Sequence, residues 1–326
     1  MKRTNMKKLF TSLVALMVAT MSFAQELVAT LSHDDNITMF YGTFALRDAL
    51  EAAVSGDVIN LSGGSFQAED IEKAVTLRGT GIDDVNPTFI INSFTIEVPT
   101  DDANRLSMEG IRCTGSISTY GEFNNAYFLK CQFDKIYIYS TCTCKNMTFA
   151  NCKLTNTFLV YSDDSSVQFV NSYVGDFQSI SAKGSSFSFY NCVIKRSVNI
   201  YYSHLYNCII YGGSGSGVLG SSNSAYHCVS IGTGSVSDNH LKNEISTFEE
   251  MFKDFTGTYS DEQTFELTDA AKTKFLGNDG TEVGIYGGLM PYSSTPTYPL
   301  ITKMNVAKKT TADGQLDVEI EVSATE

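Results

Sequence analysis

A short phrase that recurs between Cys113 and Ile231 constrains the fold more than any other feature of this 326-residue sequence. One position of the phrase holds a small residue of the kind that proteins bury, and it returns about every 20 residues. The small residues are Cys113, Cys131, Cys152, Ser172, Cys192, Cys208 and Cys228; a preceding aromatic column holds Phe128, Phe149, Phe169 and Phe189; a polar column between them holds Lys130, Asn151, Asn171, Asn191, Asn207 and His227. Self-similarity at this period indicates a solenoid.

The pattern within one repeat indicates which kind of solenoid this is. In residues 146–154 (NMTFANCKL), Met147 and Phe149 alternate with polar or small neighbours, so they share one face of a strand. Asn151 interrupts the alternation, as a turn residue that tolerates left-handed backbone does, and the alternation then resumes. A further alternating run follows in three repeats, at residues 135–140, 157–162 and 198–203. Three short strands per turn predict a parallel β-helix with coils stacked about 4.8 Å apart, whereas a leucine-rich repeat would need Leu-rich spacing and a helical segment.

Phrases of the type FxNCxI, as at residues 189–194 (FYNCVI), and the corner Asn column resemble the bacterial right-handed parallel β-helix proteins of the pectate-lyase-like superfamily. The resemblance implies an all-β, right-handed solenoid, in agreement with the handedness rule for parallel crossovers. The best-known activity of that superfamily is β-elimination of pectate, which uses carboxylates that hold Ca²⁺ and an Arg or Lys base. Glycoside hydrolases on this fold use Asp clusters from adjacent coils.

The N-terminal residues predict export. Several Lys and Arg residues precede an apolar run at 9–21, and residues 22–24 fit a small-x-small cleavage site. Residues 1–24 are therefore expected to be a signal peptide, with Gln25 as the mature N-terminus. No other apolar run is long enough to span a membrane. We expect the protein in the periplasm, at the cell surface or outside the cell.

The net charge and the cysteine pattern indicate which classes of partner, disulfide and metal site are not expected. The formal net charge of −13 disfavours nucleic acid and other polyanions as partners. Eight cysteines in an exported chain ordinarily indicate disulfides, but stacked parallel side chains suit a ladder of free, buried thiols better than S–S geometry. Cys142 and Cys144 lie off the column, and neither a bond between them nor a metal site is expected from their spacing.

The flanking segments are expected to close the solenoid. Residues 25–39 are predicted to be an extended lead-in, and residues 43–55 an amphipathic cap helix with Thr43 as N-cap and Gly56 as its end. A second helix is predicted at residues 241–255. The expected divisions are 1–24 (signal peptide), 25–240 (parallel β-helix), 241–291 (C-terminal cap and closing segment) and 292–326 (Pro-rich linker and β-hairpin tail).

The sequence does not assemble a catalytic or metal site. Asp163 and Asp164 are the acidic pair of the solenoid, and their simpler interpretation is a solvated corner. With Lys135 as base they would be the candidates for a polysaccharide lyase or glycoside hydrolase, and only that alternative would involve Ca²⁺ as a cofactor. His227 occupies the position that Asn holds in other repeats, so we expect a corner hydrogen-bonding residue there rather than a general base.

Tyrosines recur near one phase of the repeat: Tyr120, Tyr137, Tyr139, Tyr161, Tyr201 and Tyr202. Alternation places some of them outward, where aromatic rings can stack on sugars, although aromatic residues also simply suit strands. The expected binding residues are Tyr137, Tyr139, Tyr161, Asp163 and Asp164. We expect an exported, non-catalytic, monomeric protein that presents a surface for a polysaccharide or a cell-surface protein; the alternative is the lyase or hydrolase.

Overall fold

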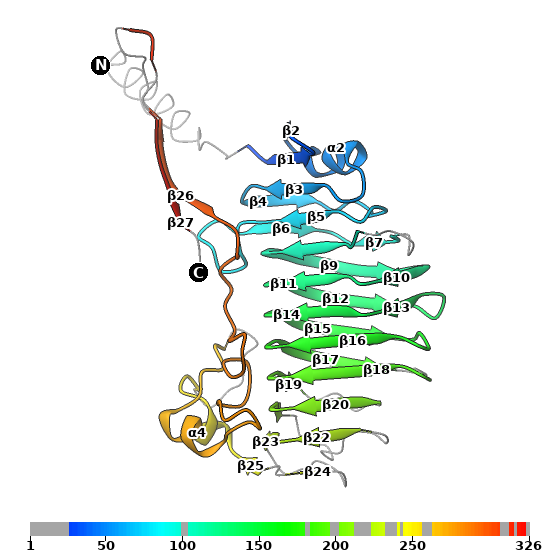
Figure 1. The fold of residues 1–326 in the computed structure, drawn as a ribbon, viewed down its shortest axis with the longest axis vertical. Coiled ribbons are helices and arrows are strands. Elements are labelled where there is room, and N and C mark those ends of the chain that lie inside the picture. The colour runs from blue at the N-terminus through cyan, green and yellow to red at the C-terminus, as the bar shows by residue number, and fades with distance from the viewer. Residues whose placement is uncertain are drawn as a thin grey trace, which may run out of the picture.

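The chain forms a parallel β-solenoid of about seven turns, stacked along the long axis of the molecule (Figure 1). The computed structural model describes residues 26–98, 104–179, 183–195, 202–211, 223–231, 240–241, 244–255, 263–306, 313–315 and 318–323. The fold is all-β with few helices, as the repeat predicted. The expected signal peptide lies outside the described residues, and no helix within the described residues is long and apolar enough to cross a membrane.

Two long sheets run the length of the solenoid, and a typical coil gives one strand to each. The first sheet holds, in spatial order, β2 (Asn36–Tyr41), β1 (Val28–His33), β3 (Val58–Leu61), β5 (Thr76–Arg78), β8 (Ser107–Glu109), β11 (Tyr127–Leu129), β14 (Met147–Ala150), β16 (Ser166–Val170), β18 (Ser186–Tyr190), β20 (Ser203–Tyr206), β22 (Ser224–Tyr226) and β24 (His240–Leu241). From β3 onward its strands are parallel.

The second sheet is parallel throughout its described strands. It holds β4 (Gly64–Gln67), β6 (Thr88–Ile91), β9 (Ile111–Thr119), β12 (Gln132–Ile138), β15 (Lys153–Val160), β17 (Tyr173–Ser179), β19 (Val193–Lys195), β21 (Ile209–Tyr211), β23 (Val229–Ile231) and β25 (Glu244–Ser246), with β7 (Phe94–Ile96) beside β9. A separate two-stranded sheet pairs β10 (Glu122–Asn124) with β13 (Thr143–Lys145).

The long strands of the second sheet correct the prediction of three separate short strands per coil. The runs 135–140 and 157–162 begin as the second halves of β12 and β15 and continue two residues beyond the ends of these strands, whose pairing shifts register in the middle. In the coils of β9, β12 and β15 one bent strand therefore replaces two, whereas β6 and β7 remain separate strands beside the two halves of β9. Gly115 lies at the bend of β9, where a Cβ would come within 1.9 Å of the Asn92 carbonyl oxygen. Of the third predicted run, 198–203, only the end lies within the described residues.

The polar column forms the corner between the two sheets, as predicted from the repeat. Its members have left-handed backbone, with φ between 46° and 55°; they are Lys130, Asn151, Asn171, Asn191, Asn207 and His227. Asn tolerates this region better than most residues because its short side chain can hydrogen-bond locally. The backbone N–H groups of the corner residues still donate to the next coil. The Asn151 backbone N–H, for example, donates to the Val170 carbonyl at 3.0 Å. A one-residue corner thus turns the chain without breaking the stacking.

Ladders of identical side chains fill the core. The rings of Phe128, Phe149, Phe169 and Phe189 stack with centroid separations of 4.7, 5.2 and 4.8 Å. The predicted Cys column is also present, and its thiols are buried and free. Phe158 and Phe177, from the second sheet, pack edge-on against this stack. The side chains of the two inner faces interdigitate in one buried cluster along the described coils.

The N-terminal end is closed by a helix and an antiparallel hairpin. Helix α2 (Ala45–Ala52) lies within the predicted 43–55, but Phe44 rather than Thr43 is its N-cap and no side chain caps it. At its C-terminus the Lys73 ammonium donates to three carbonyls, those of Leu50, Glu51 and Ala53. The expected extended lead-in is instead the β1–β2 hairpin, because Asp34 adopts left-handed backbone at its turn. Strand β1 pairs antiparallel with β3 and covers the first coil.

The segment after β25 packs on the side of the solenoid, against outward residues of the second sheet. The predicted helix at 241–255 is only α3 (Phe248–Met251), and α4 (Asp269–Lys274) follows. Their buried side chains join outward residues of β17 to β23 in a second apolar cluster; its members include Tyr173, Val193, Ile209, Val229, Met251, Phe252, Phe265 and Phe275. In these coils the residues that follow the corner are apolar and face outward. Exposing them to water would be unfavourable, and the C-terminal segment covers them.

Residues 278–298, here called the strap, run back along the corner column. The Asn171 amide donates to the carbonyls of Ile285 and Gly287, at 2.8 and 2.7 Å. Further along, Asn151 accepts from the Ser293 N–H at 2.6 Å and Glu109 accepts from the Thr297 N–H at 2.5 Å. The corner side chains therefore hold the strap rather than one another, which differs from the simple Asn ladder expected from the repeat.

The tail beyond the strap is an antiparallel hairpin of β26 (Leu300–Val306) and β27 (Val318–Ser323). Figure 1 shows it extending away from the coils. The turn between the two strands includes Gly314, whose φ is 75°. The alternating runs around ADG in the tail predicted this hairpin correctly.

Candidate functional site

The predicted tyrosines gather on one rim of the solenoid. Tyr120, Tyr139 and Tyr161 follow the ends of β9, β12 and β15, which pair in register Thr119–Ile138–Val160. Their ring centroids are 5.3 and 6.3 Å apart, and the planes deviate by only 19° and 6°. Tyr120 and Tyr161 are 40% and 36% exposed. We call these three residues the tyrosine ladder.

Tyr137 lies beside the ladder rather than within it. It belongs to the outward column of β12, opposite Ser118 of β9 and Leu159 of β15. Its ring centroid is 6.2 Å from that of Tyr139. The structure therefore brings together the three tyrosines that the sequence analysis proposed. Tyr202 is 39% exposed and has left-handed backbone, but Tyr201 lies outside the described residues.

Stacking decides which part of each ring a ligand can reach. Neighbours in the ladder cover each other's faces, because a separation of 5–6 Å between parallel rings leaves no room for a sugar ring between them. Within the ladder a ligand can therefore reach the ring edges and the outer faces of the two end rings, Tyr120 and Tyr161. This arrangement differs from the outward-facing platforms expected from the sequence, and it favours hydrogen bonding and edge contacts over face stacking.

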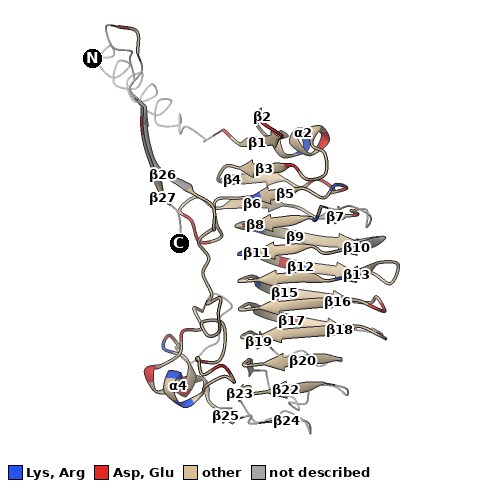
Figure 2. Ribbon diagram, in the orientation of Figure 1, with Lys and Arg blue, Asp and Glu red and all other residues tan. Residues whose placement is uncertain are grey.

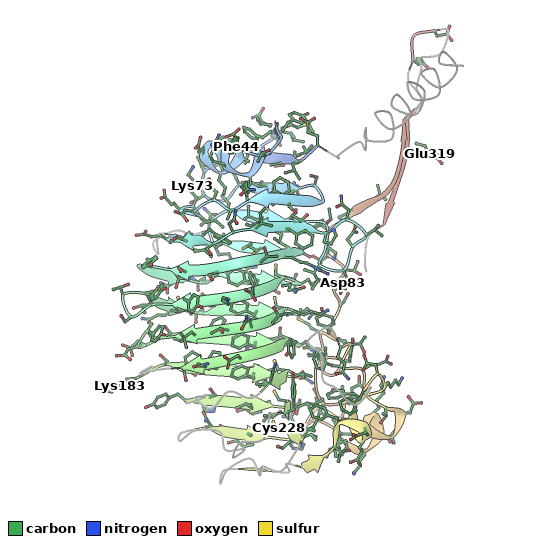
Figure 3. The ribbon with its side chains drawn as sticks, turned by 180° about the vertical axis from the view of Figure 1, so that it is seen from behind. Phe44, Lys73, Asp83, Lys183, Cys228 and Glu319 are labelled. Carbon is green, nitrogen blue, oxygen red and sulfur yellow. The ribbon has the colours of Figure 1, made fainter. Side chains whose placement is uncertain are left out.

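The acidic pair forms the corner that follows Tyr161. The Asp163 carboxylate accepts the Lys183 backbone N–H of the next coil at 2.8 Å, and Asp164 has left-handed backbone with φ 54°. Both residues are exposed. Figure 3 shows Lys183 on the rim opposite the C-terminal segment. Asp163 thus stabilises a turn between coils, in accord with the solvated-corner interpretation.

The candidates for the enzymatic alternative are not gathered into one site. Lys135 pairs with Ser116 near the bend of β12, and its ammonium lies 3.9 Å from Asp134. Asp163 and Asp164 lie beyond the far end of the neighbouring strand β15. Among the residues that the structure describes, no three His, Cys, Asp or Glu side chains are placed to hold a metal ion. The arrangement therefore offers neither the base nor the carboxylate cluster of a lyase at this position.

A groove on the first sheet was missed by the sequence analysis. Its volume is about 460 Å³, and its lining includes Arg78, Arg105, Ser107, Glu109 and Tyr127. The Arg105 guanidinium lies 4.6 Å from the centroid of the Tyr127 ring. Neither guanidinium pairs with a carboxylate of a described residue. The sequence signal is weak, because an isolated Arg at the end of a strand has no distinctive pattern.

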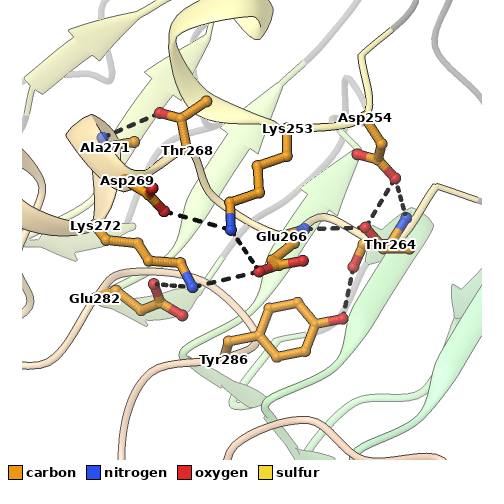
Figure 4. Close-up of polar contacts among 10 residues, drawn as sticks. All are labelled: Lys253, Asp254, Thr264, Glu266, Thr268, Asp269, Ala271, Lys272, Glu282 and Tyr286. Carbon is orange, nitrogen blue, oxygen red and sulfur yellow. Dashed lines mark hydrogen bonds and ion pairs between the residues drawn. The ribbon is translucent and has the colours of Figure 1, made fainter.

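Charged side chains around α4 form a network of ion pairs. Figure 2 shows acidic and basic residues together around α4, and Figure 4 shows their contacts. Lys253 contacts Glu266 at 2.8 Å and Asp269 at 3.4 Å, while Lys272 contacts Glu266 at 3.6 Å and Glu282 at 3.7 Å. The hydrogen bond with Lys253 lowers the pKa of Glu266 and raises that of Lys253. These pairs tie the C-terminal segment together and offer no unpaired charge for catalysis.

Comparisons with models of protein families, with curated proteins and with solved structures found no match. The function must therefore be argued from the site itself, since a fold alone does not define an activity.

Proposed function

We propose that this protein is exported and non-catalytic, and that the rim of its solenoid binds a glycan or another protein of the cell envelope. At the level of family we propose a relation to the right-handed, pectate-lyase-like β-helix proteins, supported by the FxNCxI phrases and the corner Asn column. Export is supported by the basic and apolar pattern of residues 1–24. The formal net charge favours a neutral or positively charged partner over a polyanion.

The tyrosine ladder is the observation that carries this proposal. Three tyrosines on successive coils keep a fixed spacing and expose part of each ring on a rigid support. Tyr is favoured at binding surfaces because it offers large contact area and a hydroxyl group at low cost in conformational entropy. A polymer lying parallel to the solenoid axis would meet one hydroxyl per coil. Asp163 and Asp164 border the same rim and supply acceptors for sugar hydroxyls.

A pair of double variants tests the proposal. Tyr139→Ala with Tyr161→Ala removes two rungs of the ladder, and we expect loss of retention on the polysaccharide gel that retains the unmodified protein. The matched control is Tyr206→Ala with Tyr226→Ala, which removes two rings stacked at 5.1 Å on the first sheet. Retention is measured by affinity electrophoresis in neutral glucan, pectin and peptidoglycan fractions, with circular dichroism to verify folding.

Two outcomes would contradict parts of the proposal. If neither double variant changes retention, or if no glycan retains the protein, the ladder is not a glycan site and the protein-partner form of the proposal is left. Incubation with pectin and alginate, with and without Ca²⁺, addresses the enzymatic alternative. Unsaturated products or new reducing ends that disappear in Asp164→Ala would show that the non-catalytic assignment is wrong.

A further inference from the structure

We propose that Cys142 and Cys144 form a reversible disulfide with each other, which makes the rim of the solenoid a thiol modification site. Their Sγ atoms are 3.2 Å apart, and both side chains lie on the inward face. Each thiol is free in this structure. This inference does not depend on the proposed binding function.

The local backbone suits a bond between these two residues. The Cys142 N–H donates to the Tyr139 carbonyl at 2.9 Å in a tight turn, and β13 begins at the next residue. Cys142 lies in the turn just before β13, and an extended rise from it to Cys144 would place their Cα atoms about 6.6 Å apart. That separation falls near the upper end of the range that disulfides bridge, about 4.4–6.8 Å. Closing the ring therefore needs only a small movement of the turn.

The thiols of the column are held differently. Cys131 donates from Sγ to the Leu129 carbonyl at 3.3 Å, and Cys152 donates to the Ala150 carbonyl at the same distance. Burial raises the pKa of Cys131 to about 12, so this thiol stays protonated at neutral pH. A protonated thiol that is bonded to a carbonyl is a poor nucleophile.

Neighbouring groups give the two off-column thiols distinct roles. The Thr119 hydroxyl donates to the Cys142 sulfur at 3.3 Å, and the Cys144 sulfur lies 3.2 Å from the same atom, where either thiol can be the donor. The hydrogen bond with Cys144 lowers the pKa of Cys142, and the same bond raises the pKa of Cys144. The Thr119 hydroxyl lies closer to the sulfur of Cys142 than to that of Cys144, at 3.3 against 3.9 Å, so we assign Cys142 as the attacking thiolate and Cys144 as the thiol that resolves the intermediate.

The oxidant is a small-molecule disulfide, and the exchange balances with it. The Cys142 thiolate attacks one sulfur of the disulfide, forms a mixed disulfide and releases the first small thiolate. Cys144 then gives its proton to a base in solution and attacks the Cys142 sulfur, which releases the second small thiolate. Protonation of both leaving thiolates uses the two protons that the cysteines lost. One disulfide is reduced and one is formed.

Access to the pair comes from local opening at the rim. Both side chains are at most 1% exposed, so the oxidant cannot reach them in the closed structure. Strand β13 pairs only with β10 in a two-stranded sheet, whereas the column residues adjoin sheets of 12 and 11 strands. Cys142 and Cys144 belong to the same core cluster as the column, but a two-stranded sheet opens at lower free energy than the long sheets beside it. The rim thiols are therefore expected to react before those of the column.

Peptide mapping of the full chain provides the test. Trypsin cleavage after Lys135 and Lys145 yields a peptide, residues 136–145, that contains Cys142, Cys144 and no other cysteine. After incubation with oxidised glutathione and blocking of free thiols, we expect this peptide to lack two hydrogen atoms and to carry no blocking group. The peptides that contain Cys131 or Cys152 are expected to be blocked after denaturation. Dithiothreitol should restore two blockable thiols in residues 136–145.

Two variants distinguish ring formation from simple oxidation. Cys144→Ser should trap Cys142 with one glutathione attached, because the resolving thiol is gone. Cys152→Ser is the matched control and should leave ring formation unchanged, since Ser172 already occupies an equivalent column position. The proposal is overturned if residues 136–145 remain fully blockable after oxidation, or if they carry glutathione on both cysteines in the unmodified protein.

Discussion

Replacing Asn171 by alanine tests whether the corner column holds the strap. This side chain is 2% exposed, and its amide donates to the carbonyls of Ile285 and Gly287, at 2.8 and 2.7 Å. Alanine removes both donors and leaves two carbonyl oxygens without these partners in a dry interface. It also places a residue with a Cβ, and without a polar side chain, at φ 46°.

The magnitude follows from these two effects. Two hydrogen bonds at about 1 kcal/mol each account for about 2 kcal/mol, and left-handed backbone without a compensating polar side chain costs about 1 kcal/mol more. We therefore expect Asn171→Ala to lower the free energy of unfolding by about 3 kcal/mol. Asn146→Ala is the matched control, because Asn146 has φ 57° but is exposed, and its side-chain amide donates to the Asn125 side chain at 3.2 Å. Its expected cost is about 1–1.5 kcal/mol.

Urea denaturation followed by circular dichroism measures both values, and limited proteolysis of the native proteins reports release of the strap. With chymotrypsin, we expect faster cleavage within the strap, after Tyr286 or Tyr292, in Asn171→Ala than in Asn146→Ala. Equal unfolding free energies and equal cleavage rates in the two variants would refute the reasoning, because the cost would then come from the corner backbone alone. Asn171→Gly separates the effects further, since glycine accepts the left-handed backbone without strain.

Three further predictions follow from the core and the N-terminal end. The hydrogen bond to Asp57, at 2.7 Å, raises the pKa of His33 above its ordinary value of 6.5, so this contact stabilises the fold fully below that value and is lost as pH rises through the raised pKa. The stabilisation should vanish in His33→Gln, and NMR titration of the imidazole signals would contradict the reasoning if His33 titrated at or below 6.5. Phe169→Ala should lower the free energy of unfolding by about 3–5 kcal/mol, since its fully buried ring stacks between rings of both neighbouring coils; a loss below about 1 kcal/mol in urea denaturation would mean that the ladder relaxes around the gap. Cys152→Leu should cost about 1–3 kcal/mol through overpacking, whereas Cys152→Ser should be nearly neutral because Ser172 makes the same kind of bond to a carbonyl two residues earlier; equal thermal midpoints for the two variants would contradict this.

The sequence predicted the solenoid because its physical basis is local and repeated. Phe149 and Asn151 each recur at the period of the coil, so one alternation and one turn residue define every turn. The prediction of a helix over 241–255 was wrong. The apolar spacing of Phe248 and Met251 also suits a short helical turn within an irregular segment that buries these side chains in the second apolar cluster. Thr43 failed as a cap because the preceding hairpin, rather than a capping side chain, fixes where α2 begins.

The candidate site was predictable only in part. Tyr139 and Tyr161 could be aligned from the repeat, because they follow equivalent strand ends. Their mutual stacking could not, because ring orientation depends on side-chain rotamers that alternation does not determine. The contact between Cys142 and Cys144 depends on the turn at Tyr139, and the strap depends on pairings more than 100 residues apart.

The strap also determines the order in which the molecule can be completed. The Thr297 N–H of the strap donates to Glu109, and these two residues are 188 positions apart in the sequence. Contacts between residues so distant in sequence form slowly, because a long loop must close first. The corner column exists only once coils have stacked, which makes strap docking a late event in folding. Contacts that form after the transition state act mainly on the unfolding rate. The strap is therefore expected to slow unfolding far more than it accelerates folding. It gives the stacked coils kinetic stability and is not part of the folding nucleus.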